Sequence, residues 1–164
     1  MKQKSLSEFA RIAVTAAIYV ALTLLIAPLS YGAVQLRFAE VMTLLCFFRR
    51  DYCYALILGC AISNLFSPLG VLDLSFCVLS TVFSVVGIRL CKRLWTASLL
   101  PTLSMVFIAW EFAITGASFW FTFLTAAMGE FAVVTVLGLP LMALLQKNRF
   151  FMEHILKTDR KPRN

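Results

Sequence analysis

Long apolar runs, separated by short polar or basic junctions, make up most of the chain. The runs at residues 7–28, 72–90, 95–114 and 118–145 are long enough for an α-helix to cross a membrane, which takes roughly 20 residues. Two shorter runs lie at residues 37–48 and 52–66, and the first is short for a full crossing. We therefore predict an all-α membrane protein with six transmembrane helices in a single domain, residues 1–164, including a tail at 146–164.

Polar residues enter the second apolar run at its start. The chain turns after Pro28 and then carries Gln35, Arg37 and Glu40 back into apolar sequence. Charged side chains at membrane depth are costly, so they mark a substrate or ion pathway by default. The alternative is that Arg37 and Glu40, three residues apart, only neutralise each other at a helix end. This stretch alone leaves both interpretations open.

The composition is that of a membrane protein. Of the 164 residues, 61% are hydrophobic and 14% are charged, whereas a soluble domain is about 45–50% apolar and about 25% charged. The basic start of the chain leads into an apolar run without a small-residue cleavage signal. We therefore expect a retained first helix rather than a signal peptide.

The basic residues predict the orientation of the helices. All of them except Arg37 fall on one side of a six-helix arrangement, at the amino terminus, the junctions near residues 49–50 and 89–93, and the tail. The positive-inside rule then places both termini in the cytoplasm of a multi-pass protein of the cell membrane. The net charge of +7 is explained in this way, so we do not expect a nucleic-acid partner.

The cysteines and the single histidine give no sign of a metal site. The five cysteines form no C-x-x-C pair and lie in apolar sequence, which is typical of buried, inert thiols. His154 lies in the polar tail, where we expect it to be solvated.

Polar groups from several helices converge on the outer side of this arrangement. Asn64, Asp73 and Glu111 lie at outer helix ends, together with Glu40. Glu130 lies about a dozen residues into the last helix, or roughly 18 Å at 1.5 Å per residue, near the middle of a ~30 Å hydrocarbon core. We predict one small-molecule site. The alternative, acids that face water in loops, remains open for Asp73 and Glu111 but fits Glu130 poorly.

The residue types in this site indicate the class of ligand. Four carboxylates against one arginine suit a ligand that is rich in N–H donors or positively charged. A carboxylate accepts two parallel N–H bonds, as a guanine-type base could offer. Aromatic residues that could stack on such a base are Tyr31, Phe66, Trp110 and Trp120. The chain has no phosphate-binding loop and no catalytic motif, so we expect neither an enzyme nor a cofactor in this chain.

Small residues follow one face of the first helix. Ala13, Ala17 and Ala21 recur every four residues, a spacing that lets another helix approach closely. The pattern alone favours packing within the bundle over docking of a partner protein.

Three motifs resemble the QueT family. They are SYGAVQLRFAEVMTLL at residues 30–45, G-x-x-x-x-N-x-x-S-P-x-G-x-x-D at 59–73, and G-E-x-x-V-x-x-x-L-G-L-P at 129–140. Members of this family are S components, the substrate-binding subunits of energy-coupling factor (ECF) transporters. The chain differs from our expectation for the family at Phe38 and Ala39, which bears only on fine specificity.

The resemblance implies a fold, a ligand and partners. The fold would be a six-helix S component with an outward-facing site beneath the loop that joins the first two helices. The ligand would be a deazaguanine base, a queuosine precursor. The partners would be a transmembrane T subunit and two ATPases that use ATP, with Ala13, Ala17 and Ala21 as the docking surface for the T subunit.

We therefore interpret the chain as the substrate-capture subunit of an ECF-type importer. One alternative is an oligomeric proton-coupled transporter with Glu130 as the proton carrier, which would need no ATPase. An S component for another vitamin-like base is a second alternative. A membrane scaffold without a saturable ligand is a third.

Overall fold

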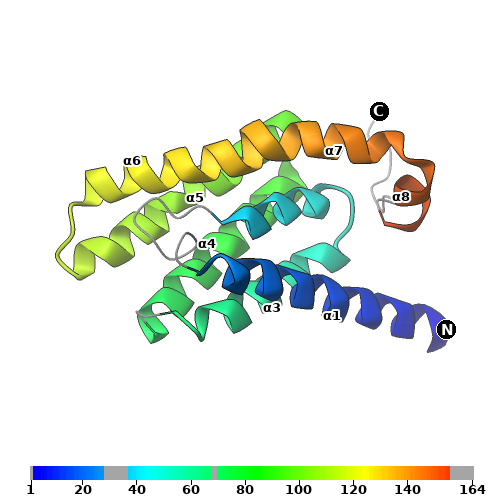
Figure 1. Ribbon diagram of the computed structural model, residues 1–164, viewed down its shortest axis with the longest axis horizontal. Helices are drawn as coiled ribbons and strands as arrows, with labels where there is room; N and C mark the ends of the chain where they lie inside the picture. The colour runs from blue at the N-terminus through cyan, green and yellow to red at the C-terminus, as the bar shows by residue number, and fades with distance from the viewer. Residues whose placement is uncertain (1, 28–36, 68–69, 156–164) are drawn as a thin grey trace.

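The computed structural model describes the chain except for residues 1, 28–36, 68–69 and 156–164. Within the described residues the secondary structure is entirely helical (Figure 1). The elements are α1 (Lys2–Leu25), the 3₁₀-helix η1 (Phe38–Phe47), α3 (Asp51–Asn64), α4 (Val71–Leu90), α5 (Leu94–Ile114), α6 (Phe119–Glu130), the π-helix η2 (Phe131–Leu137), α7 (Gly138–Lys147) and α8 (Arg149–His154).

Four helical segments are long and apolar enough to cross a membrane. They are Leu6–Leu25, Val71–Leu90, Leu94–Ile114 and Phe119–Lys147, the last of which comprises α6, η2 and α7 in one continuous rod (Figure 1). The two shorter predicted helices correspond to η1 and to the 14-residue α3. The all-α membrane bundle is therefore confirmed, whereas six complete crossings remain a prediction.

The short element η1 lies in the middle of the bundle (Figure 1). It packs against α1, α3, α4, α5, η2 and α7. Our prediction of an ordinary α-helix at residues 37–48 was wrong in helix type. A 3₁₀-helix rises about 2.0 Å per residue, against 1.5 Å for an α-helix, so ten residues span roughly 20 Å instead of 15 Å. The tighter, narrower winding lets a short segment reach further between its neighbours.

The last long helix changes its winding next to Glu130. The seven residues Phe131–Leu137 form a π-helix, a rare winding that is frequent at functional sites. Directly after it, Gly138 lets the helix lie close to η1. A Cβ atom at Gly138 would lie 3.1 Å from Cδ1 of Leu44.

A second close approach joins α1 to α3. A Cβ atom at Gly59 would lie 3.0 Å from Cβ of Tyr19 and 3.2 Å from the carbonyl oxygen of Ala16. The absence of a side chain at Gly59 therefore lets α1 lie against α3, and it fixes the position of Tyr19, which is fully buried.

The start of α1 and the helix α8 lie at the same end of the bundle (Figure 1). Ion pairs at this end connect α1 to the start of α3. Asp51 Oδ2 lies 2.8 Å from Arg49 Nη2 and 3.7 Å from Arg11 Nε. The hydroxyl group of Tyr52 donates to the carbonyl oxygen of Ile155 at 2.9 Å.

Candidate functional site

The site is built around Arg37, which immediately precedes η1 and is buried. Its Nη2 atom donates to Asn64 Oδ1 at 3.3 Å and to Cys77 Sγ at 3.4 Å. The same atom lies 3.9 Å from Asp73 Oδ1. Arg37 therefore connects η1 to the end of α3 and to the first turns of α4. The alternative that Arg37 and Glu40 only neutralise each other is therefore not sufficient, because Arg37 also holds partners on α3 and α4.

The partners of Arg37 are themselves held in place. The amide group of Asn64 donates to the carbonyl oxygen of Cys60 at 2.8 Å, which orients its Oδ1 atom towards the guanidinium. The thiol of Cys77 donates to Asp73 Oδ1 at 2.8 Å. All three partners are buried, and these hydrogen bonds hold them in a defined orientation towards Arg37.

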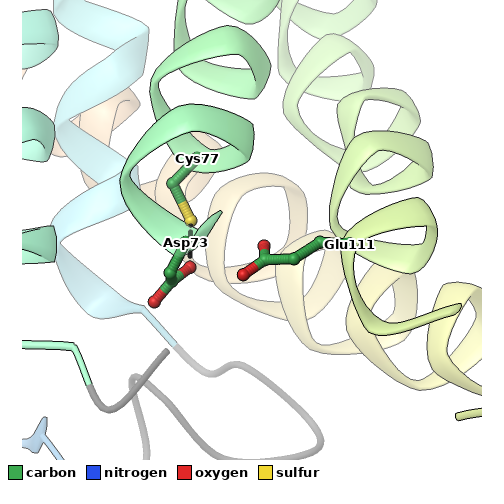
Figure 2. Close-up of side chains that lie close together, drawn as sticks. All are labelled: Asp73, Cys77 and Glu111. Atoms are coloured by element: carbon green, nitrogen blue, oxygen red, sulfur yellow. Dashed lines mark hydrogen bonds between the residues drawn. The ribbon is translucent and has the colours of Figure 1, made fainter. Parts of the chain in front are cut away.

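Glu111 on α5 faces this network. Figure 2 shows its carboxylate directed towards Asp73 and Cys77, and the potential ligand atoms of the three side chains lie within 4.8 Å of one another. Glu111 is 0% exposed, and neither of its carboxylate oxygens has a hydrogen-bond partner within the described part of the chain. A buried carboxylate without donors is costly unless it is protonated or meets an exogenous donor or cation.

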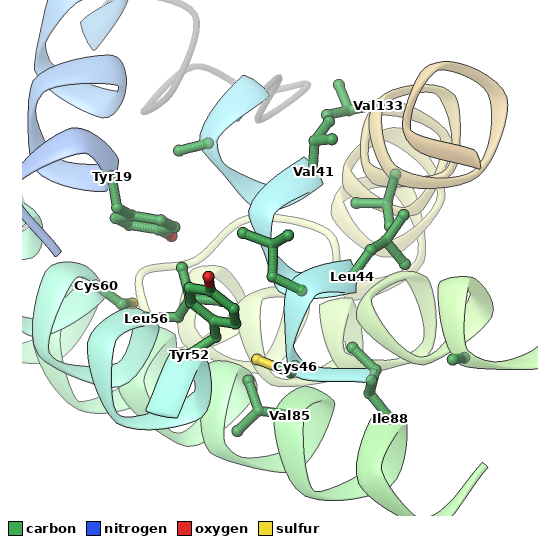
Figure 3. Close-up of a cluster of buried hydrophobic side chains, with 14 of the residues drawn as sticks. Tyr19, Val41, Leu44, Cys46, Tyr52, Leu56, Cys60, Val85, Ile88 and Val133 are labelled. Atoms are coloured by element: carbon green, nitrogen blue, oxygen red, sulfur yellow. The ribbon is translucent and has the colours of Figure 1, made fainter. Parts of the chain in front are cut away.

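Glu40 has a donor from α1. The hydroxyl group of Tyr19 donates to Glu40 Oε1 at 2.5 Å. Figure 3 shows Tyr19 projecting from α1 towards the centre of the bundle, where η1 lies. Both side chains are buried, so this bond connects the first helix directly to the site.

Glu130 completes the group of acids. It ends α6, is 1% exposed, and its Oε1 atom has no hydrogen-bond partner among the described residues. Together with Arg37 and Glu40 it lines a pocket that continues between α4 and α5. Glu130 is thus a second buried carboxylate with an acceptor oxygen available to a ligand.

Serine hydroxyl groups form the α4–α5 part of this pocket. Ser104 lies 2.8 Å from both Ser80 and Ser84, measured between Oγ atoms. The pocket is nearly closed, with a cavity volume of only ≈ 10 Å³. That volume holds about one water, whereas small-molecule pockets measure about 300–1,000 Å³. A ligand could therefore enter only if helices separate.

The structure brings most of the predicted site residues together. Arg37, Asn64 and Asp73 are in direct contact, Glu111 faces Asp73, and Glu40 and Glu130 share one pocket with Arg37. The alternative of water-facing acids does not hold, since Asp73 is 3% and Glu111 0% exposed. Tyr31 and Gln35 lie outside the described residues.

The other aromatic predictions and the alanine face have different outcomes. Phe66, Trp110 and Trp120 are 65%, 61% and 70% exposed and do not line this pocket, so their stacking on a ligand remains a prediction. The three alanines, Ala13, Ala17 and Ala21, are exposed, whereas Ala16, Tyr19 and Thr23 form the buried face of α1. Packing of the alanine face within this chain is thereby excluded.

Several site residues were missed from the sequence. Tyr19 was not considered, although a tyrosine deep in a membrane helix needs a partner for its hydroxyl group. Cys77 was predicted to be buried and inert. It is buried, but its sulfur accepts a hydrogen bond from Arg37 and its thiol donates one to Asp73. The available signal was a polar stripe at helical spacing on α4, whose buried members are Asp73, Cys77, Ser80, Thr81 and Ser84.

Comparison with known proteins shows that this chain is similar to a transporter family and to a named transporter. A family model described as QueT transporter matches residues 9–147. The chain is 34% identical over 150 residues to the "Queuosine precursor transporter QueT" of Lactococcus lactis subsp. cremoris (strain MG1363), an alignment that covers 80% of this chain and 88% of the relative. No solved structure matches the chain.

Proposed function

Because this chain belongs to the QueT transporter family, we propose that it is the substrate-capture subunit of an ECF-type importer for a queuosine precursor. The substrate is a deazaguanine base, taken up from the outer side of the cell membrane. The residues that hold it are Arg37, Glu40, Asn64, Asp73, Glu111 and Glu130, with Tyr31 and Gln35 contributed by the preceding segment.

The observation that carries this proposal is the set of buried carboxylate oxygens without donors. Both oxygens of Glu111 and Oε1 of Glu130 are buried and lack a partner in the described part of the chain. A guanine-type edge presents adjacent N–H donors in one plane, which a carboxylate accepts in parallel. A donor-rich planar base therefore supplies what these acids lack.

Capture requires an opening movement. The pocket between η1, α4, α5 and α6 has room for about one water molecule, which is too little for a two-ring base. The base can enter only if some of these elements move apart. We propose the π-helix η2 next to Glu130 as the segment that changes its winding, because this rare winding is frequent at functional sites.

The exposed alanine face is the proposed docking surface. Ala13, Ala17 and Ala21 point away from the bundle on the side of α1 opposite to Tyr19. A helix of the T subunit could approach closely there, and two ATPases bound to that subunit would supply the energy. Six crossings with both termini in the cytoplasm complete the proposed topology, in agreement with α8 and the start of α1 at one end.

The experiment is to identify the small molecule that co-purifies with the protein. Mass spectrometry should find a deazaguanine base, and a chain that binds no such base would refute the proposal. Ala17→Trp tests the docking surface: it should retain ligand binding but lose transport and co-purification of the T subunit. Leu22→Trp is the matched control, since Leu22 is 37% exposed on the same helix but, five residues from Ala17, lies on a different face of α1. Normal transport by Ala17→Trp would exclude this surface.

A second candidate function follows from Glu130 alone. A buried carboxylate in the last helix, with one oxygen that has no partner among the residues that the structure describes, could carry a proton. A proton-coupled transporter would take up substrate in vesicles without any ATPase, driven by a pH gradient. Uptake that requires the ATPases and is insensitive to the gradient would exclude it.

A further inference from the structure

We propose that Asp73 and Glu111 bind a positively charged amine on the substrate, so that the chain selects deazaguanine bases that carry an alkylammonium group over neutral ones. This inference rests on the proposed function and deepens it. The central pocket with Glu40 and Glu130 would take the planar edge of the base, and the Asp73–Glu111 pair would take its substituent.

The first argument is the geometry of the pair. Asp73 lies in the first turn of α4, and Glu111 lies in the last turn of α5. Figure 2 shows the carboxylate of Glu111 directed towards Asp73, and one oxygen of each residue lies within 4.8 Å of the other. Both residues are buried. Two like charges at this separation repel each other in a poorly solvated place, and a cation between them removes the repulsion.

The second argument is the uneven compensation of the two acids. Asp73 accepts from Cys77 at 2.8 Å and lies 3.9 Å from the guanidinium of Arg37. Both oxygens of Glu111, in contrast, lack a partner within the described residues. Asp73 is therefore compensated at close range, whereas Glu111 is the acid whose oxygens lack a hydrogen-bond donor within the described residues.

The third argument is the donor count of the possible substituents. An alkylammonium group has three N–H donors and no acceptor, which matches two facing carboxylates. A nitrile has an acceptor and no donor, so its nitrogen would face carboxylate oxygens unfavourably. An amine-bearing base is thus favoured and a cyano-bearing base is disfavoured by the same two residues.

A metal ion is the other possible cation. Two carboxylates and a thiol can bind Zn²⁺. However, Arg37 Nη2 lies 3.4 Å from Cys77 Sγ and 3.9 Å from Asp73 Oδ1. Its fixed positive charge would repel a divalent ion at this position more strongly than a monovalent ammonium group. The geometry therefore favours the amine.

The test measures equilibrium binding of 7-aminomethyl- and 7-cyano-7-deazaguanine to the purified full chain, with and without EDTA. Wild-type protein should bind the aminomethyl base more tightly by about 10- to 100-fold, the range expected for hydrogen bonds to a charged group. Glu111→Gln should remove this preference by weakening the binding of the aminomethyl base, whereas the affinity for the cyano base should not fall, because glutamine offers the nitrile an N–H donor in place of a carboxylate oxygen. Glu153→Gln, an exposed acid on α8, is the control and should change neither affinity.

Each outcome decides between the possibilities. Equal wild-type affinities for the two bases would overturn the inference, as would an equal loss of both affinities in Glu111→Gln. A preference that disappears in EDTA would assign the pair to a metal ion and overturn it too. If neither base binds to wild-type protein, the proposed function fails and this inference fails with it.

Discussion

Replacement of Glu130 by glutamine should change stability and ligand affinity in opposite directions. Glu130 is 1% exposed, has an oxygen without a partner among the described residues, and shares its pocket with Glu40. Glutamine has nearly the same shape, carries no charge and can donate an N–H to Glu40. The ligand-free protein should therefore become more stable by about 1–3 kcal/mol, the penalty of an unsatisfied buried group.

The same substitution should weaken ligand binding. Glutamine replaces one acceptor oxygen with a donor, which would face an N–H group of the base. The loss should again be about 1–3 kcal/mol, or roughly one to two decades in the dissociation constant.

Thermal unfolding and equilibrium binding of the purified protein measure the two effects. The stability gain should raise the apparent midpoint by roughly 2–12 °C, at about 2–4 °C per kcal/mol for a chain of this size. Glu8→Gln, an exposed acid on α1, should change neither quantity. A lower midpoint in Glu130→Gln would mean that Glu130 stabilises the fold. Unchanged affinity would remove it from the site.

Three further predictions concern the support of the site. Tyr19→Phe removes the 2.5 Å bond to Glu40 and should lower the stability by about 1.5–3 kcal/mol; an unchanged unfolding midpoint would refute this. Arg37→Met leaves the buried Asp73 without its positive partner and should lower the stability by about 3–5 kcal/mol. Asp73→Asn in the same chain should restore a large part of this loss. Additive losses in the double variant would exclude a coupling between Arg37 and Asp73. Gly59→Ala places a methyl group 3.0 Å from Cβ of Tyr19 and should cost about 1–3 kcal/mol in thermal unfolding, whereas a wild-type midpoint would argue against close packing of α1 on α3.

The positions of the long helices could be predicted from the sequence. Residues 72–90 and 95–114 were expected and Val71–Leu90 and Leu94–Ile114 are observed. An apolar run bounded by charges has only one way to satisfy its backbone in lipid, so its ends follow from composition. At the amino terminus α1 begins at Lys2, before the predicted residue 7, because a helix can continue past the apolar run.

The winding of the two special helices could not be predicted. In η1 apolar and small residues occupy nearly every position, and seven of its ten residues are buried. No periodicity then distinguishes a 3₁₀-helix from an α-helix. The π-helix η2 follows Glu130 in an equally apolar run. Both windings depend on how neighbouring helices pack, which is information that a single sequence does not contain.

The grouping of the acids inside the bundle could be predicted, but the residues that support them could not. Glu40 and Glu130 stood out because charge is rare in apolar sequence. Tyr19 and Cys77 did not, since neither carries a charge that stands out in apolar sequence. Tyr19 supports the site through its hydrogen bond to Glu40, 21 residues away in the sequence. Cys77 supports it through the hydrogen bond that it accepts from Arg37, 40 residues away.

A structure of the chain with a bound deazaguanine base is the most direct measurement of the proposed function. The base should lie among Arg37, Glu40 and Glu130, with carboxylate oxygens about 2.7–3.2 Å from its ring and exocyclic nitrogens. The pocket should have opened from its present ≈ 10 Å³. A base bound elsewhere, for example in the apolar groove that Phe83 and Phe107 line, with the acids still unpartnered, would contradict the proposal.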